Sequence, residues 1–285
     1  MEGEFRTSMR KIIISLAPVS VETPEDTRNP LKPQEIAEEV INCAQEGAAL
    51  VHLHVRNQQG ELTDNLQTFS ETTELIRDNS DIIIQGSTGG LSSLSVEERC
   101  IALNDPGVEC ASLNMGSVNF DNEVYINTLP EIRCWATRMK EKGIIPELEI
   151  FDGAMINNSK LLMEEGIIER PLNFAFCLGK KGALPASTYN IQFLQGMLPE
   201  DAKWGLVHVD MQDLSLLATA IGMGASFVRI GFEDSIYYAK PEYAKTNLIL
   251  VKRLASLIKN MGLDIATARE AREILGFDKQ VSQVS

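Results

Sequence analysis

The sequence predicts an α/β protein with a single (β/α)8 barrel, or TIM barrel. Short apolar runs rich in β-branched residues alternate with longer segments of helical period, and eight such units can be counted along the chain. The chain has 285 residues, and barrels of this type usually have about 250. No proline-rich or highly charged stretch divides the sequence, so we expect one catalytic barrel domain at 11–285. Residues 1–10 form an N-terminal extension that could derive from an expression vector.

The first two units show the pattern clearly. The run at 12–16, Ile-Ile-Ile-Ser-Leu, is rich in β-branched residues, which favour strands. After a proline-containing loop, Ile36, Val40 and Cys43 recur at helical spacing, and Gly47 ends that helix. The second run, 49–55, leads through a turn at Gly60 to a helix near 69–78.

The other strands follow in the same way. A third run, 81–85, precedes the turn at 87–90, and Ser95 with Glu98 forms a capping box that begins the next helix. A doubly wound sheet is the alternative fold, but it usually has a glycine fingerprint after its first strand, where this chain has Leu-Ala-Pro-Val. The remaining strands are expected at 108–113, 144–151, 173–178, 204–209 and 226–231.

The composition excludes several classes of function. With 40 acidic against 26 basic residues the net charge is -14, and a surface of that sign repels nucleic acids and anionic membranes. No segment has the pattern of a signal peptide or a transmembrane helix. The five cysteines are an odd number without a C-x-x-C pair. We therefore expect a cytoplasmic protein that binds neither nucleic acid nor membrane.

Two of the three histidines, His52 and His54, are two residues apart in the second predicted strand. Alternate residues of a strand face one side and lie roughly 6.6 Å apart, so both imidazoles can reach one metal ion. The eighth run ends in Glu233 and Asp234, where a barrel presents its active site. Two histidines and a glutamate are a typical zinc-binding set with one open position. The alternatives are hydrogen-bonded interior histidines and helix capping by the two carboxylates.

Two other segments contain candidate site residues. A pair of glutamates shares one face of the fifth predicted strand, and buried carboxylates are unfavourable unless they are paired or used. Glu149 is the one nearer the C-terminal end, and Arg229 is its expected ionic partner; an interior salt bridge without function is the alternative. Ser87, Thr88 and Gly89 offer hydroxyl and backbone N–H groups for a carboxylate or phosphate, although such a run is often only a turn.

Several segments match a known family when they are taken together. They are 48–56 around the two histidines, the turn at 85–90, 111–120, Pro-Glu-Leu-Glu at 146–149, 228–234 and 266–275. In this order, between Lys11 and Gly276, they resemble the β-keto acid cleavage enzymes. The combination is far more specific than any single motif.

The resemblance implies a zinc-dependent TIM barrel, usually a homotetramer, that condenses a β-keto acid with acetyl-CoA and releases acetoacetate and a new acyl-CoA. It assigns the zinc to His52, His54 and Glu233. It also implies that Asp234, held by Arg229 and Glu149, removes a proton from C2 of the substrate. The implied substrate contacts are Ser87 with Thr88 and Gly89 of its turn, Ser112 on the reacting carbonyl, Asn114, and Glu22 at the variable end of the substrate.

Two regions depart from the family pattern or are not explained by it. After the seventh strand the family often has Gly-Arg, whereas this chain has His208, either a substrate contact or an interior histidine, followed by carboxylates at 210 and 213. Anionic groups there and at Glu22 favour a cationic or hydroxylated substrate, whereas an outward Glu22 would leave His208 to attract an anionic one. Lys180 and Lys181 are the expected site for the phosphates of CoA, with a solvated turn as the alternative.

Other classes use similar residues. Amidohydrolases place H-x-H on their first strand and need further metal-binding histidines, and only His208 is left in this chain. A metal-dependent aldolase shares the enolate chemistry but does not depend on an acyl-CoA. A non-catalytic barrel should have lost Arg229 or Asp234, and both are present.

Overall fold

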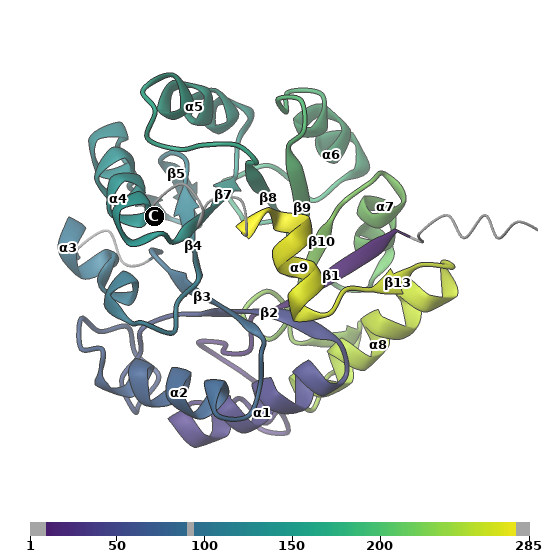
Figure 1. Ribbon diagram of the computed structural model, residues 1–285. Helices are drawn as coiled ribbons and strands as arrows, with labels where there is room; N and C mark the ends of the chain where they lie inside the picture. The colour runs from purple at the N-terminus through teal and green to yellow at the C-terminus, as the bar shows by residue number, and fades with distance from the viewer. Residues whose placement is uncertain (1–9, 90–93, 278–285) are drawn as a thin grey trace, which may run out of the picture.

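The computed structural model describes residues 10–89 and 94–277, in which eight parallel strands form a closed ring (Figure 1). Barrel strands pair in chain order, and β10 pairs with β1 from Ile13–Phe227 to Leu16–Ile230. The predicted (β/α)8 fold is confirmed. Most of the predicted extension, residues 1–9, and residues 278–285 lie outside the described residues. The ring consists of β1 (Lys11–Leu16), β2 (Ala48–Leu53), β3 (Ile83–Ser87), β4 (Cys110–Asn114), β7 (Ile145–Ile150), β8 (Asn173–Leu178), β9 (Lys203–His208) and β10 (Phe227–Ile230).

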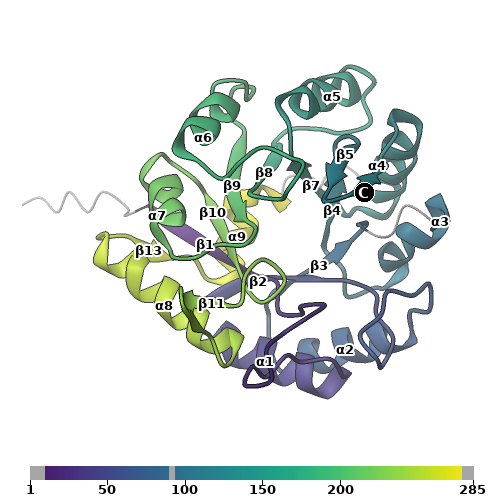
Figure 2. The ribbon, with the colours of Figure 1, turned by 180° about the vertical axis from the view of Figure 1, so that it is seen from behind.

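Helices surround the ring, as Figures 1 and 2 show from opposite ends. Because the strands are covered on both faces, they appear in the sequence as nearly continuous apolar runs; every residue of β2 and β8 is buried. Within the described residues, each helix is too short or too polar to cross a bilayer. The outer helices are α1 (Pro33–Gln45), α2 (Gln67–Arg77), α3 (Val96–Arg99), α4 (Leu129–Lys142), α5 (Gly153–Glu164), α6 (Thr188–Gln195), α7 (Ser215–Gly222) and α8 (Asn247–Asn260), with a 3-10 turn at Ile101–Asn104.

The last helix, α9 (Ala268–Leu275), crosses the N-terminal end of the barrel (Figure 1). It follows β13 (Asp264–Ile265), which pairs with the start of β1. Asn173, the first residue of β8, donates a hydrogen bond to the carbonyl of Leu275 at 3.1 Å. Because α9 covers this end, we expect a ligand to enter from the C-terminal ends of the strands.

Two short antiparallel hairpins follow the C-terminal ends of β4 and β10, and the sequence did not predict them. They are β5 (Val118–Phe120) with β6 (Glu123–Tyr125), and β11 (Tyr237–Ala239) with β12 (Glu242–Tyr243). Strands of two or three residues are too short to show an alternating pattern. The first hairpin contributes Tyr125 to the site described below.

Candidate active site

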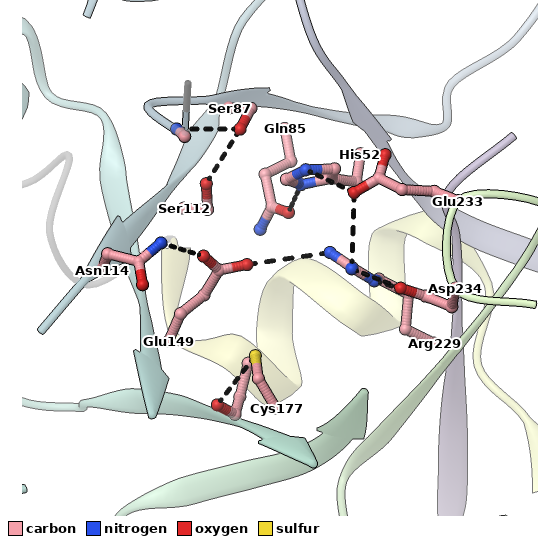
Figure 3. Close-up of polar contacts among 12 residues, drawn as sticks. His52, Gln85, Ser87, Ser112, Asn114, Glu149, Cys177, Arg229, Glu233 and Asp234 are labelled. Carbon is pink, nitrogen blue, oxygen red and sulfur yellow. Dashed lines mark hydrogen bonds and ion pairs between the residues drawn. The ribbon is translucent and has the colours of Figure 1, made fainter. Parts of the chain in front are cut away.

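His52, His54 and Glu233 meet at the C-terminal ends of β2 and β10, and Figure 3 shows His52 beside Glu233. The fold brings them together because β1 lies between β2 and β10 and pairs with both. The Nε2 atoms of the two histidines are 3.4 Å apart. Oε1 of Glu233 is 3.6 Å from Nε2 of His52 and 3.4 Å from Nε2 of His54.

These distances fit a zinc ion. In a tetrahedral site with bonds of about 2.0–2.2 Å, two ligand atoms lie about 3.3–3.6 Å apart. Within the described residues, one group of three or more histidine, cysteine or carboxylate side chains lies close enough together to hold one metal ion, and it consists of these three. Three protein ligands leave a fourth position open, as in catalytic zinc sites.

The protonation states of the cluster also suit a metal. Burial lowers the pKa of His52 to about 3, although the Glu233 charge opposes this, so the ring is neutral at ordinary pH. Burial alone would raise the pKa of Glu233, but the neighbouring His54 and Arg229 outweigh it and hold that pKa well below its usual range. Neutral imidazole and ionised carboxylate are the forms that coordinate zinc.

Asp234 lies beside this cluster and is held by Arg229 (Figure 3). Nε and Nη2 of Arg229 donate to Oδ2 and Oδ1 of Asp234 at 2.8 and 2.6 Å, a bidentate pair that fixes the plane of the carboxylate. Both side chains are buried. Burial raises the pKa of Asp234, with the Arg229 charge opposing this rise. A carboxylate with a raised pKa is a stronger base.

Glu149 extends this network across the barrel. Its Oε1 is 3.8 Å from Nη1 of Arg229, and its Oε2 accepts a hydrogen bond from Nδ2 of Asn114 at 2.7 Å. The same nitrogen of Asn114 lies 3.3 Å from the hydroxyl of Tyr125, which comes from the β5–β6 hairpin and was not predicted. Burial raises the pKa of Glu149 to about 8, although the Arg229 charge opposes it.

We expect Glu149 to make the stability of the fold depend on pH. The folded state binds this proton more tightly than the unfolded chain, in which the carboxyl titrates near 4.5, so its contribution to stability is lost as pH rises from about 4.5 to about 8. Glu149→Gln should therefore gain stability relative to the wild type between pH 5 and pH 8, by roughly a few kcal/mol. Urea unfolding of both proteins at the two pH values measures this; a difference that does not change with pH would contradict it.

The turn after β3 lies next to the metal cluster. Oγ of Ser87 accepts a hydrogen bond from the N–H of Gly89 at 3.0 Å and is 3.5 Å from Oγ of Ser112 (Figure 3). The hydroxyl of Thr88 donates to the carbonyl of Ser112 at 2.6 Å, so it holds the turn against β4. A Cβ at Gly89 would lie 3.0 Å from Oγ of Ser87 and 3.6 Å from the His54 ring, so glycine keeps this approach open. Gly90 lies outside the described residues.

His208, at the end of β9, lines a surface pocket together with Asp210 and Asp213. Burial lowers the pKa of His208, and the two aspartates oppose this. Asp210 adopts a left-handed conformation (φ 56°), and its N–H donates to the carbonyl of Asp234 at 2.8 Å, which ties this loop to the candidate base. Glu22 is exposed on the loop after β1.

The two lysines predicted for the CoA phosphates lie on the loop after β8. Nζ of Lys180 is 3.1 Å from a carboxylate oxygen of Asp121 and 5.2 Å from the ring centre of Phe120. The carbonyl of Lys181, whose side chain is exposed, accepts from the N–H of Asp121 at 2.9 Å. The lysines thus connect this loop to the β5–β6 hairpin, and the charge of Lys180 is already compensated by Asp121.

Comparison with known proteins adds to this geometry. A family model described as beta-keto acid cleavage enzyme matches residues 11–277. The 3-keto-5-aminohexanoate cleavage enzyme of Fusobacterium nucleatum subsp. nucleatum is 36% identical over 276 residues, which cover 95% of this chain and 100% of that relative. The 3-oxoadipate:acetyl-CoA acetyltransferase of Cupriavidus necator is 33% identical over 274 residues, 93% of this chain and 94% of that relative. The apo structure of ObcA has the same fold, with a TM-score of 0.73 at 20% identity over 87% of this chain and 65% of that chain.

Proposed function

Because the chain belongs to the beta-keto acid cleavage enzyme family, we propose that it condenses a β-keto acid with acetyl-CoA and releases acetoacetate and a new acyl-CoA. The observation that carries the proposal is the position of the Arg229-bound carboxylate of Asp234 beside three side chains spaced as zinc ligands, His52, His54 and Glu233. Acetyl-CoA as the second substrate is supported by two relatives, which are named 3-oxoadipate:acetyl-CoA acetyltransferase and 3,5-dioxohexanoate:acetyl-CoA acetone transferase.

The first step is removal of a proton from C2 of the β-keto acid. A C–H next to a ketone is a weak acid and an aspartate is a weak base, so the enolate needs strong stabilisation. Zinc, when bound, would supply positive charge for this purpose, worth several kcal/mol. Asp234 takes the C2 proton. Arg229 holds the Asp234 carboxylate in place, and Glu149 in turn contacts Arg229. Ser87, Ser112 and the backbone of the turn orient the carboxylate and the carbonyl of the substrate.

The acyl transfer then follows without a further acid or base. The C2 carbanion attacks the thioester carbonyl of acetyl-CoA and releases CoA thiolate. The thiolate attacks C3, the ketone carbon of the original β-keto acid, and the bond between C2 and C3 breaks to give the new acyl-CoA. The proton on Asp234 returns to C2, which completes acetoacetate and restores the ionised base.

Acetoacetate formation from a panel of β-keto acids, with and without acetyl-CoA, tests this function. The proposal requires that turnover depends on acetyl-CoA and that one acyl-CoA forms for each acetoacetate. Cleavage at the same rate without any acyl-CoA would instead indicate a metal-dependent aldolase.

The family resemblance extends the proposal to assembly and location. We propose a cytoplasmic homotetramer, and light scattering of the purified protein measures its mass.

We also propose Lys181, with Lys180 beside it, as a contact for the phosphates of CoA, because the net charge of -14 otherwise repels them. Lys181→Glu should raise KM for acetyl-CoA more than KM for the keto acid.

We expect the charges around His208 to set substrate preference. A second carboxylate on the substrate would approach Asp210 and Asp213, at a cost on the order of a few kcal/mol. The enzyme should therefore have a higher kcat/KM for an amino- or hydroxy-substituted β-keto acid than for β-ketoadipate, and Asp213→Asn should reduce this difference in kcat/KM. A wild-type preference for β-ketoadipate would contradict this prediction. If His208→Gln then lost that preference, His208 would be identified as the group that attracts the second carboxylate.

A further inference from the structure

We propose that Gln85 is a positioning residue for the metal site: its side-chain carbonyl holds His52 in the tautomer whose Nε2 accepts the metal. Oε1 of Gln85 is 2.6 Å from Nδ1 of His52, on the side of the ring opposite to Nε2 (Figure 3). Gln85 is fully buried on β3, directly beside His52 in the register of β2 and β3. The inference rests on the proposed zinc site and adds a residue that neither the family match nor the ligand set assigns.

An imidazole that coordinates a metal through one nitrogen is neutral and has a single ring proton. A neutral ring carries its proton on either Nδ1 or Nε2. Because an amide oxygen only accepts, its short contact with Nδ1 of His52 requires the proton there and leaves the lone pair of Nε2 facing His54 and Glu233. With the Gln85 amide reversed, its NH2 group would donate to Nδ1, and the ring proton would then point at the ligand centre.

The surroundings of Gln85 favour the observed amide orientation. The amide nitrogen points away from His52 (Figure 3), and Gln85 lines a small interior cavity together with Glu147 and Asn173. Glu147 is a buried carboxyl group, and such a group offers hydrogen-bond acceptors to an NH2 group. Nε2 of Gln85 completes no hydrogen bond within the described residues. The interaction of Gln85 with Glu147 nevertheless opposes the rise that burial causes in the pKa of that carboxyl, so the carboxyl is within reach of the NH2 group and the carbonyl of Gln85 is left for His52.

The second histidine lacks such a contact. Nδ1 of His54 is buried and makes no hydrogen bond within the part of the chain that the structure describes. Partners of this kind fix the orientation of metal-binding imidazoles, and their removal typically weakens metal affinity about 10–100-fold. We therefore expect the loss of the Gln85 carbonyl to act through His52.

The tautomer can be observed without metal or substrate. Nitrogen-15 NMR of the zinc-free wild type should show His52 with its proton on Nδ1, and its signal is identified by its absence in His52→Gln; the chain has only three histidines. A His52 ring with its proton on Nε2 would overturn the proposal. Because no turnover is measured, this result does not depend on the acyl-transfer function.

Zinc affinity, measured by competition with a chelator, gives the second readout. Gln85→Leu should bind zinc about 10–100-fold more weakly than the wild type, whereas Gln85→Glu, which keeps an acceptor, should bind at least as tightly. Asn173→Leu makes the same change to another buried amide of the interior cavity and should bind like the wild type. Wild-type affinity in Gln85→Leu, or an equal loss in Asn173→Leu, would overturn the proposal. If Gln85→Leu does not fold, the Gln85→Glu affinity and the wild-type tautomer decide.

Discussion

His52→Ala should lose both zinc and turnover, whereas the wild type should hold about one zinc per chain. The three ligand atoms lie 3.4–3.6 Å from one another, and removal of the buried His52 leaves only two of them. Because the metal would supply several kcal/mol of stabilisation to the enolate, turnover should fall by roughly 1000-fold or more. Elemental analysis and acetoacetate formation measure the two effects on the same preparations.

His208→Ala is a matched control for this experiment. It removes the same type of side chain from the end of another barrel strand, β9, outside the ligand cluster. We expect it to keep its zinc. A wild type without zinc, or full activity in a variant that lacks both His52 and His54, would remove the metal from the mechanism.

Much of the site could be predicted because barrel geometry follows from strand order. Residues two apart in a strand must share a face, which placed His52 with His54. Closure of the ring puts the second and eighth strands on either side of the first, which placed Glu233 near them. The structure brings all three together, and it also places Arg229 between Asp234 and Glu149.

Other parts of the site depend on features that periodicity does not encode. The contact of Gln85 with His52 requires the register of β2 against β3, which a pattern of apolar residues leaves open. Tyr125 arrives on a three-residue strand, too short to show an alternating pattern. The sequence left open where the side chain of Glu22 points. Glu22 lies on a loop, whose course periodicity does not predict, and its side chain is exposed.

Asp234→Asn should keep zinc and lose the exchange of the substrate's C2 protons with deuterium. Asparagine has nearly the same shape as aspartate, and the ligand Glu233 is unchanged, so the metal cluster should remain. The amide, however, is neutral and cannot take a proton at C2. It also presents an NH2 group to one of the two Arg229 donors, so that Arg229 can donate to only one oxygen in place of two.

The exchange experiment isolates this step because it needs no acetyl-CoA. Proton NMR of a β-keto acid in deuterium oxide follows the C2 signal, and the enzyme-catalysed rate should fall by about 100- to 10,000-fold in Asp234→Asn, the usual contribution of a positioned base. Zinc content near the wild-type value shows that the loss is not a loss of metal. Glu149→Gln should lose less, because it leaves the bidentate contact between Arg229 and Asp234 in place. Undiminished exchange in Asp234→Asn would mean that another group removes the proton.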